Sequence, residues 1–462
     1  MGPMLQQDDG SSVTSTPLQF FSMMSPNLGS NYPWLRELKP EERGLYLIHL
    51  LLTCANHVSS GSLENANLAL EQISHLATPD GDTMQRIAAY FAESLSERVL
   101  KSWPGLYRAL QCTKMSVVSE EIVARKLFFE IFPFLKLSFV VANQSIIEAM
   151  EGEKMVHIID LNASEPAQWI ALIQALSARP EGPPHLRITG VHQQKAVLEQ
   201  VAHRLTEEAE KLDLPFQFNP IVSKLENLDI EKLRVKTGEA LAISSVLQLH
   251  TLLAHEDDSL RRNLPLALMK QANWGRFPVL PNKDGANRHS PSNDSASSSP
   301  QSVSGSPKMD GFLNALWGLS PKIMVIAEQD SNHNGSALME RLSEALYYYA
   351  ALFDCLESTL PRSSIERRKV EKMVLGEEIK NIIASEGGDR RERHEKLDKW
   401  FQRLDMAGFG SVPLSYIGML QARRLLQGCG SDGYRIREEN GCLVICWQDR
   451  PLYFVSTWKC RR

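Results

Sequence analysis

The sequence predicts an α/β protein in which a helical cap lies on a mostly parallel sheet that ends in an antiparallel meander. Three observations predict this class. Helical apolar patterns alone fill the region from about residue 41 to 152. Short β-branched runs then alternate with amphipathic helical segments over 151–328, which is typical of a parallel sheet with helical crossovers. Near the end of the chain, Asn440-Gly441 is the strongest short hairpin signal and separates two apolar runs.

The composition is that of a large protein with a substantial core. The chain has 462 residues, of which 43% are hydrophobic, so it allows two or three domains or one large α/β domain with a cap. The net charge of −5 gives no overall basic field that would recruit nucleic acid. The first residues lack a signal-peptide pattern and no apolar run is long enough to span a bilayer, so we expect an intracellular protein without a membrane association.

The cysteines and histidines show no metal-site pattern along the chain. Seven cysteines are widely spread without a Cys-x-x-Cys pair, which suits reduced thiols in the cytosol or nucleus. His333 and His394 have no companions at ligand spacing, so we expect no zinc site. Cys442 and Cys446 fall on one face of an expected strand, where core packing is favoured over redox chemistry.

The N-terminal third divides into an irregular segment and a helical cap. Residues 1–30 are rich in Ser, Gln, Pro and Met without periodicity, so we expect them to be disordered. The region 31–150 forms the helical cap with a first leucine repeat, which allows either internal packing or a surface for dimerisation or partner binding. Internal packing is favoured because the repeats are short and broken. The candidate interface residues are Leu47, Leu50, Leu51, Leu63, Leu70 and Ile73.

The core of the chain is organised around the run Met155–Asp160. This β-branched run has no polar alternation, which indicates a strand buried on both faces. The strand ends at Asp160, and Ser164 or Glu165 is expected to cap the next helix with Pro166 in its first turn. A carboxylate thus lies where open α/β sheets bind their ligands.

The rest of the core region, 151–462, continues this alternation of strands and helices. Further parallel strands are expected at His185–Val191, at Phe216–Val222, within Glu239–Leu249 and at Ile323–Glu328, and antiparallel strands at Tyr434–Arg437, Cys442–Trp447 and Leu452–Trp458. Strands of this length separated by helices predict a parallel sheet. Antiparallel strands commonly close one side of such a sheet.

A stretch rich in serine and proline at 281–308 interrupts the core and is expected to be a flexible insertion. It contains three Ser-Pro pairs, at Ser290, Ser299 and Ser306, which are candidates for proline-directed phosphorylation. The alternative is that such pairs follow from the composition alone, and this alternative is favoured.

Two further segments allow a structural interpretation or a nucleic-acid one. The run Arg390–Glu395 mixes both signs of charge, so a solvated helix face with internal ion pairs is favoured over phosphate binding. The cluster Tyr347–Tyr349 is more typical of packing than of stacking on bases.

Asp160 at the end of its strand could indicate a nucleotide or S-adenosylmethionine site, but the sequence lacks two features that such a site needs. These are glycines after the first strand and an acid after the second. Here Asp160 is followed by Leu-Asn-Ala-Ser-Glu-Pro, and the second strand ends at Gly190-Val191-His192. We therefore expect no cofactor, no catalytic residue and no metal.

Several motifs in order resemble the GRAS family of plant transcriptional regulators, from about residue 40 to the end. The name-giving strand motif is followed by a Gln-Trp pair, an Arg-Glu-containing segment and a terminal set of tryptophans. The matching residues are Val156, His157, Ile158, Ile159, Asp160, Gln168, Trp169, Arg391, Glu392, Trp400, Gly408, Trp447, Ser456 and Trp458. The sequence departs from the family at Pro166, where many members carry glycine, and in its longer serine-rich insertion.

The resemblance implies a helical cap on a Rossmann-like core that is similar to methyltransferases but without established catalysis. It implies a nuclear regulator, and the Scarecrow-like members that this chain most resembles are associated with gibberellin response and root patterning. The implied partners are other GRAS proteins, including the DELLA repressors, and zinc-finger proteins of the indeterminate-domain type that supply the DNA contact. A homo- or heterodimer is also compatible with the resemblance.

The leading hypothesis is a transcriptional coregulator that acts through protein partners. One alternative is a transcription factor that binds DNA directly and sequence-specifically, which would need basic side chains on one face of an acidic protein. The other is an S-adenosylmethionine-dependent methyltransferase, which would need the missing glycines.

Overall fold

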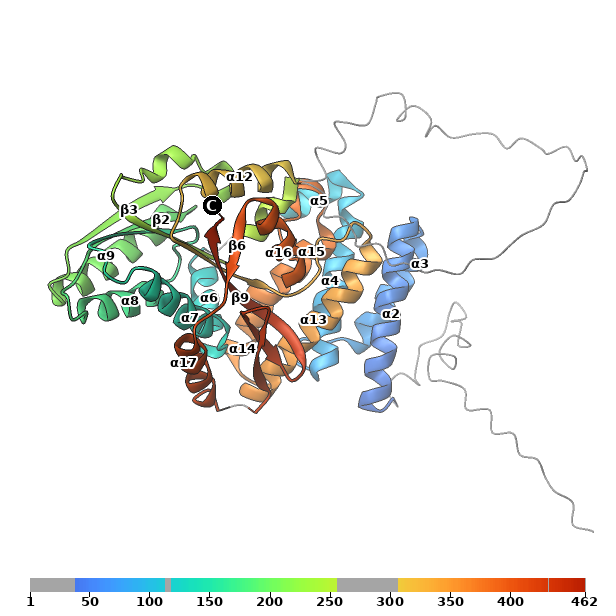
Figure 1. The fold of residues 1–462 in the computed structure, drawn as a ribbon. Helices are drawn as coiled ribbons and strands as arrows, with labels where there is room; N and C mark the ends of the chain where they lie inside the picture. The colour runs from blue at the N-terminus through green and yellow to red at the C-terminus, as the bar shows by residue number, and fades with distance from the viewer. Residues whose placement is uncertain (1–37, 113–117, 256–305, 431, 462) are drawn as a thin grey trace, which may run out of the picture.

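The computed structural model describes residues 38–112, 118–255, 306–430 and 432–461, whose centre is a nine-stranded mixed sheet (Figure 1). The strand order is β3-β2-β1-β4-β5-β9-β8-β7, and β6 pairs with β9 outside this path. The strands are β1 (Met155–Asp160), β2 (His185–His192), β3 (Phe216–Val222), β4 (Ala240–Val246), β5 (Ile323–Gln329), β6 (Phe409–Val412), β7 (Tyr434–Glu439), β8 (Cys442–Trp447) and β9 (Arg450–Cys460). The predicted fold class is confirmed, since a mostly parallel sheet continues into antiparallel strands.

In the parallel half of the sheet, the direction in which successive strands are added reverses at β1, which contains the family motif. β1 pairs in parallel with β2 on one side and with β4 on the other, so Asp160 lies next to Gly190 and Ser244. The sheet then extends outward to β3 on one side and to β5 on the other. Open α/β sheets bind ligands in the crevice at such a reversal, beyond the carboxyl ends of the strands. A ligand site in this fold is therefore expected beyond the carboxyl ends of β1, β4 and β5.

The C-terminal strands extend the sheet through β9, which pairs in antiparallel fashion with β5 and β8. The turn between β7 and β8 has a φ of 51° at Asn440 and 76° at Gly441. Two consecutive left-handed residues match the tight hairpin turn that the Asn-Gly pair predicted. The strand β6 was not predicted, because a run of 4 residues is too short to show a periodic pattern.

The first helices begin and end at residues that favour such boundaries. Asp82 is the N-cap of α4: its Oδ1 accepts the Gln85 N–H at 3.0 Å, and Gln85 Oε1 accepts the Asp82 N–H at 3.2 Å. Gly61, with a φ of 75°, ends α2 in the left-handed conformation. The α-helices are α2 (Pro40–Ser60), α3 (Leu63–Leu76), α4 (Thr83–Lys101), α5 (Pro104–Gln111), α6 (Val118–Ile131), α7 (Phe134–Ala149), α8 (Ala167–Ser177), α9 (Lys195–Lys211), α12 (Pro307–Gly318), α13 (Leu338–Thr359), α14 (Ile365–Val370), α15 (Gly376–Ala384), α16 (Leu397–Met406) and α17 (Tyr416–Gln427). The shorter turns are η2 (Leu225–Asn227), η3 (Ile230–Leu233), η4 (Leu249–His255), the π-helical turn η5 (Glu371–Leu375) and η6 (Gly387–Asp389).

Two hydrophobic cores lie on opposite faces of the sheet. Side chains alternate along β1, so Val156 and Ile158 belong to the larger core and Ile159 to the smaller one. Helices α7, α8 and α9 contribute to the larger core, which continues into the helical layer of α2, α3, α4, α13 and α15 (Figure 1). Helices α12 and α16 and the turn η4 contribute to the smaller core.

The helical cap is completed by helices from the C-terminal half of the chain. Helix α2 packs against α3, α4 and α13, and α4 packs against α15. The buried Arg86 of α4 forms ion pairs with Glu357 at 2.7 Å and with Glu371 at 3.0 Å. The division of the chain into 31–150 and 151–462 stays a prediction, because this packing joins helices from both regions.

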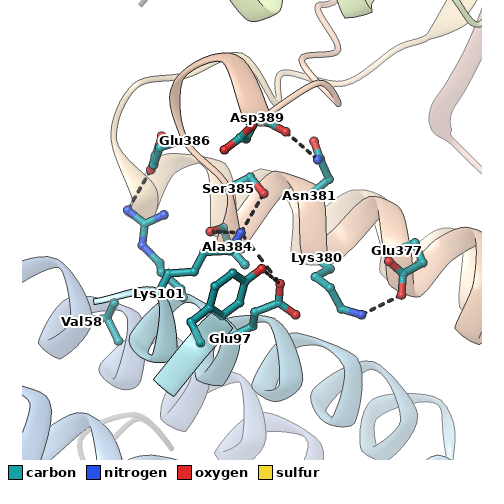
Figure 2. Close-up of a pocket in the computed structure, with 12 residues that line it drawn as sticks. Val58, Glu97, Lys101, Glu377, Lys380, Asn381, Ala384, Ser385, Glu386 and Asp389 are labelled. Carbon is teal, nitrogen blue, oxygen red and sulfur yellow. Dashed lines mark hydrogen bonds and ion pairs between the residues drawn. The ribbon is translucent and has the colours of Figure 1, made fainter. Parts of the chain in front are cut away.

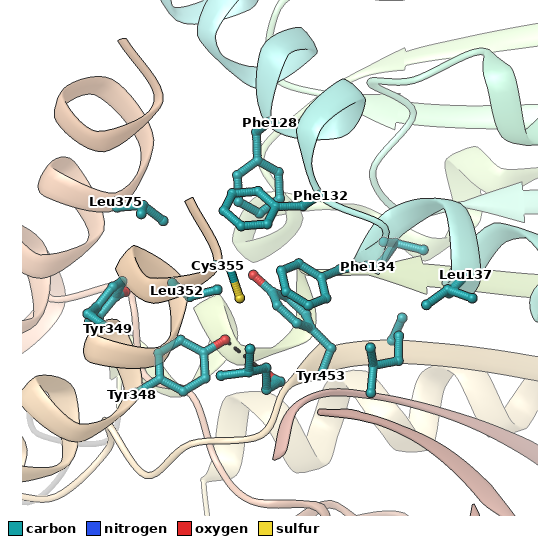
Figure 3. Packing of buried hydrophobic residues seen from close by; sticks show 14 of the residues in the cluster. Phe128, Phe132, Phe134, Leu137, Tyr348, Tyr349, Leu352, Cys355, Leu375 and Tyr453 are labelled. Carbon is teal, nitrogen blue, oxygen red and sulfur yellow. Dashed lines mark hydrogen bonds between the residues drawn. The ribbon is translucent and has the colours of Figure 1, made fainter. Parts of the chain in front are cut away.

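Aromatic side chains join the last helix of the N-terminal region to the sheet (Figure 3). Phe134 of α7 stacks on Tyr453 of β9 with ring centroids 4.3 Å apart. Tyr348 and Tyr349 of α13 are buried in the same core, which agrees with the packing interpretation of the tyrosine cluster. Tyr347 is 62% exposed.

No single helix in the described part of the chain is long and apolar enough to cross a membrane. The pair Glu120–Ile131 and Phe134–Ala149 passes by length and composition only when taken together, and it bends by 75° at its break. Ala167–Ser177 is a shorter apolar helix.

The end of the serine-rich insertion differs from the prediction. Helix α12 begins at Pro307, inside the range 281–308, because proline is well suited to the first position of a helix. Ser306 is the N-cap residue and is only 1% exposed, so this candidate phosphorylation site is not accessible in the structure. Ser290 and Ser299 lie outside the described residues.

Candidate functional site

The motif carboxylate at the end of β1 binds a tryptophan of the following helix. Asp160 Oδ2 accepts a hydrogen bond from Trp169 Nε1 at 2.7 Å, and Oδ1 accepts one from the Asn162 N–H at 3.0 Å. Burial raises the pKa of Asp160 to about 6, although these two hydrogen bonds lower it. Both oxygens are engaged inside the protein, so Asp160 fastens α8 to the end of the strand.

Backbone N–H groups of the loop between β1 and α8 donate hydrogen bonds to the neighbouring strands. The Leu161 N–H donates to Ser244 O at 3.0 Å, and the Ala163 N–H donates to Val191 O at 3.0 Å. A loop that binds phosphate leaves such N–H groups free to face the ligand. These two N–H groups of the loop are instead engaged by the neighbouring strands.

The first turn of α8 is closed in a similar way. Glu165 Oε1 accepts the Ala167 N–H at 3.2 Å, as expected for a capping side chain, although the N-cap residue itself is Pro166 rather than Ser164 or Glu165. The backbone carbonyl of Gln168 accepts a hydrogen bond from Asn143 Nδ2 of α7 at 2.7 Å. The Gln-Trp pair of the motif therefore connects α8 to α7 as well as to β1.

Gly190 of β2 lies against the loop between β1 and α8, so a larger side chain at this position would show how tightly the loop is packed. It pairs with Asp160, and a Cβ added to it would lie 2.7 Å from both Ala163 Cβ and Phe218 Cζ. We expect Gly190→Ala to lower the free energy of unfolding by about 1–3 kcal/mol, because either the loop or the strand must shift. Thermal or urea unfolding of the purified protein measures this change.

Gly311→Ala in α12 is the matched control for this substitution. A Cβ at Gly311 meets nothing within 4 Å. Alanine also avoids a cost of about 0.5–1 kcal/mol that glycine has inside a helix, so we expect the control to be as stable as the wild type or more stable. Equal unfolding midpoints for the wild type and Gly190→Ala would contradict the tight packing of the loop.

His157 of the strand motif belongs to a polar cluster on the face of the sheet opposite to Val156 and Ile158. His157 Nε2 lies 2.8 Å from Thr189 Oγ1, and Arg187 Nη2 donates to His157 Nδ1 at 3.0 Å. Arg187 also forms a two-point ion pair with Glu239, with Nε 2.9 Å from Oε1. Burial, followed by the charge of Arg187, lowers the pKa of His157 to about 4. The neutral ring therefore links β1 to β2.

A second strand-end carboxylate, Glu328 of β5, orders the segment that follows β4. Its Oε1 accepts the N–H groups of Gln248 at 3.1 Å and Leu249 at 2.8 Å, and its Oε2 lies 2.7 Å from His250 Nδ1. Burial alone would lower the pKa of His250, but Glu328 and Glu392 outweigh it and raise this pKa to about 10. Glu328 thus caps η4 and holds the His250 ring.

Two more histidines complete a buried cluster around Glu392. Glu392 Oε2 lies 3.1 Å from His250 Nε2 and 3.2 Å from His394 Nε2. His394 Nδ1 in turn lies 2.9 Å from His333 Nδ1. Ligand atoms of His250, Glu392 and His394 all lie within 4.8 Å of one another, so these residues could hold a metal ion. His333 and His394 have no companions at ligand spacing along the sequence, but the fold brings His250 to His394 from a distant segment.

The segment Arg390–Glu395 is not the solvated helix face that its charges predicted. It has no regular secondary structure, and Arg390, Arg393 and His394 are at most 1% exposed. Arg390 Nη1 donates to the backbone oxygen of His333 at 3.0 Å. Mixed charge along a sequence predicts ion pairs within the segment, but most of the partners here come from outside it, as Glu226 does for Arg391 and Arg403 does for Glu395. This burial also argues against the phosphate-binding alternative.

A hollow of about 780 Å³ lies between α4, α5 and α15 (Figure 2). Its basic side chains already have partners. Lys101 Nζ donates to Ala384 O at 3.0 Å, and Lys380 Nζ lies 2.6 Å from Glu377 Oε1. The polar side chains that line the hollow therefore hold α4 to α15.

The tryptophans of the terminal motif anchor the C-terminal strands. Trp447 Nε1 donates to Asp354 Oδ2 of α13 at 2.7 Å, and Trp458 Nε1 donates to Ser456 Oγ at 2.9 Å. Trp400 of α16 is fully buried in the smaller core. Trp400 and Trp458 thus pack in the smaller core, and Trp447 packs in the larger one.

Gly408 and Arg391 join other distant segments. Gly408 has a φ of 88°, which favours glycine, and its carbonyl accepts the Trp317 Nε1–H at 3.1 Å. Arg391 Nη2 lies 3.0 Å from Glu226 Oε1. The structure thus distributes the motif residues over the fold and does not gather them into one site.

The predicted partner-interface residues lie mainly inside the helical cap. The four that are at most 5% exposed are Leu47, Leu50, Leu51 and Ile73, and the two that are half-buried are Leu63 and Leu70. The buried four face the core, so they are not available to a partner in this structure. Internal packing, the favoured alternative, accounts for them.

Comparisons with known proteins agree with the motifs. The model of the GRAS domain family matches residues 47–459. The chain is 66% identical over 484 aligned residues to Scarecrow-like protein 3 of Arabidopsis thaliana, covering 100% of each. It is 52% identical over 437 residues to GRAS family protein TF80 of Medicago truncatula, covering 94% of this chain and 99% of that protein. The crystal structure of SCL7 in Oryza sativa has a TM-score of 0.69 and 28% identity, covering 89% of this chain and 99% of that one.

Proposed function

The chain belongs to the GRAS domain family of transcriptional regulators, which are not enzymes, and on this premise we propose that it is a plant transcriptional coregulator that acts in the nucleus through protein partners. One observation carries the proposal, which is that the polar groups of the motif are used internally. Asp160 binds Trp169, and the loop after it donates to the neighbouring strands. Polar groups that are engaged in this way support a scaffold that works by its surfaces.

The proposed partners follow from the Scarecrow-like resemblance, which the 66% identity supports. They are other GRAS proteins, including the DELLA repressors, and zinc-finger transcription factors of the indeterminate-domain type. The proposed processes are gibberellin response and root development. The zinc-finger partner supplies the DNA contact, which suits a chain with a net charge of −5.

A gel-shift experiment at physiological salt tests the proposal. The purified full chain, an indeterminate-domain zinc-finger protein and both together are mixed with the DNA site of that zinc-finger protein. We expect no shift with the chain alone and a slower band with both proteins than with the zinc-finger protein alone. A scrambled DNA site is the control. Tight, sequence-dependent binding by the chain alone would overturn the proposal in favour of direct DNA recognition.

A further inference from the structure

Two histidines and a glutamate beyond the carboxyl ends of β4 and β5 have the arrangement of a metal site, and we propose that His250, Glu392 and His394 bind one Zn²⁺ ion. The ligand atoms are Nε2 of each imidazole and Oε2 of the carboxylate. The ion would take the place of the proton that His250 Nε2 now directs at Glu392 Oε2, 3.1 Å away, and this proton would be released to solvent. Two imidazoles and one carboxylate are a ligand set that Zn²⁺ takes in proteins, with a fourth position left for water. This inference goes beyond the coregulator function and does not depend on it.

The distances between these atoms fit the edges of a zinc tetrahedron. With metal–ligand bonds of about 2.0–2.1 Å, neighbouring ligand atoms are about 3.3 Å apart. Glu392 Oε2 lies 3.1 Å from His250 Nε2 and 3.2 Å from His394 Nε2. The two imidazole nitrogens lie within 4.8 Å of each other, so a modest rotation of the rings closes the third edge.

Hydrogen bonds determine which nitrogen of His394 carries its proton. Ser331 Oγ lies 3.1 Å from Glu344 Oε1, and because a carboxylate only accepts, the hydroxyl donates there. Ser331 Oγ then accepts from His333 Nε2, which is 2.9 Å away. This leaves His333 Nδ1 to accept the His394 Nδ1–H at 2.9 Å. The proton of neutral His394 is therefore on Nδ1, and its Nε2 carries a lone pair.

The lone pair of His394 Nε2 points toward a negative charge. The atom is buried, has no hydrogen bond to any residue that the structure describes, and lies 3.2 Å from Glu392 Oε2. A lone pair and a carboxylate oxygen at this distance repel each other, although the Nε2–H of His250 also faces Glu392 Oε2 at 3.1 Å. A cation coordinated by both atoms removes the repulsion.

The outer contacts orient both rings as they do in metal sites. Glu328 Oε2 lies 2.7 Å from His250 Nδ1, and His333 Nδ1 holds the other ring through His394 Nδ1. Metal-binding histidines commonly donate their second N–H to a carboxylate or another acceptor, which fixes the ring orientation. The ion would tie η4 to the irregular segment before α16, so its role would be structural.

Metal titration of the whole protein tests this proposal. Chelator-treated protein is titrated with Zn²⁺ by calorimetry and with Co²⁺ followed by visible absorption. We expect one Zn²⁺ per chain with a dissociation constant in the micromolar range or below, and a cobalt spectrum of nitrogen and oxygen ligands. Thiolate charge-transfer bands would assign the ion to cysteines and overturn the proposal. Lack of stoichiometric binding would overturn it as well.

Variants locate the bound ion. Glu392→Gln and His394→Gln are each expected to weaken zinc binding by at least about 100-fold, because loss of a ligand exceeds the 10–100-fold effect of an outer contact. The Glu392 side chain is 25% exposed, so its variant decides the question if His394→Gln does not fold. His203→Gln is the control, since His203 pairs with Glu207 at 3.5 Å on the surface of α9 and should leave the affinity unchanged. Unchanged affinity in Glu392→Gln would overturn the proposal.

Discussion

Glu371→Gln is expected to lower the free energy of unfolding by about 3–5 kcal/mol, the cost of breaking a buried ion pair. Glu371 is fully buried and lies between two fully buried arginines. Its Oε1 is 3.0 Å from Arg86 Nε and 3.7 Å from Arg367 Nε. The substitution keeps the size of the side chain but removes the one buried carboxylate that both guanidinium groups face.

The effect should reach across the helical cap. Arg86 lies on α4, whereas Glu371 begins the π-helical turn between α14 and α15. The other acidic partner of Arg86 is Glu357 of α13 at 2.7 Å, whose side chain is 23% exposed. Because solvent screens this second pair in part, it cannot replace the buried one. Loss of Glu371 therefore weakens the contact between the N-terminal helices and those of the C-terminal half.

Urea unfolding of the wild type and the variant measures this effect. Glu71→Gln at an exposed position of α3 is the control, and we expect a change within about 0.5 kcal/mol. Adding Arg86→Met to Glu371→Gln should recover part of the lost stability, because it removes one of the two buried guanidinium groups that would otherwise share Glu357. Unfolding of Glu371→Gln at the same urea concentration as the wild type would contradict the stabilising role of this network.

The sheet could be predicted because its signals are local. A strand buried on both faces is a continuous apolar run, as at Met155–Asp160 and Ile323–Gln329, and the flanking polar residues mark its ends. The hairpin at Asn440-Gly441 depends on two adjacent residues that accept left-handed φ values. Neither feature needs information from another part of the chain.

The histidine cluster could not be predicted in this way, because tertiary contacts assemble it. His250, His333 and His394 lie on three separate segments, and spacing rules detect only ligands that share an element or a motif. One signal was present, since Glu328 ends β5 much as Asp160 ends β1, and the carboxyl ends of parallel strands share an edge.

The burial of these charges could not be predicted for a related reason. Charged residues are rarely buried unless they are paired, so a charge-rich run such as Arg390–Glu395 predicts a surface. The partners that allow burial come from elsewhere, as Asn334 Oδ1 does for Arg393 at 3.0 Å. Sequence patterns show the charges but not the partners that neutralise or bind them.

Trp169→Phe is expected to lower the free energy of unfolding by about 2–4 kcal/mol at about pH 8, and by less at about pH 5. Phenylalanine keeps most of the buried ring but removes the Nε1–H that Asp160 Oδ2 accepts at 2.7 Å. The carboxylate then keeps only the Asn162 N–H at 3.0 Å as a donor in a buried site. An ionised group left without its donor costs more than a neutral one.

The pH dependence follows from the sign of the pKa shift. Burial raises the pKa of Asp160 from 3.8 to about 6, so the wild type loses stability as the pH rises through this window. The hydrogen bond from Trp169 lowers this pKa, and without it the folded-state value rises further. The variant therefore continues to lose stability at a higher pH than the wild type does. The difference between the two proteins should grow from about pH 5 to about pH 8.

Two further substitutions separate the hydrogen bond from packing. Trp400 is fully buried, and its Nε1 has no hydrogen-bond partner among the described residues, so Trp400→Phe should cost packing energy that does not change with pH. In an Asp160→Asn background no carboxyl group remains, so the pH-dependent part of the Trp169→Phe effect should disappear. If the deficit of Trp169→Phe is instead the same at both pH values, the ionised Asp160 does not depend on the indole. The motif carboxylate would then be free of the helix and available to something else.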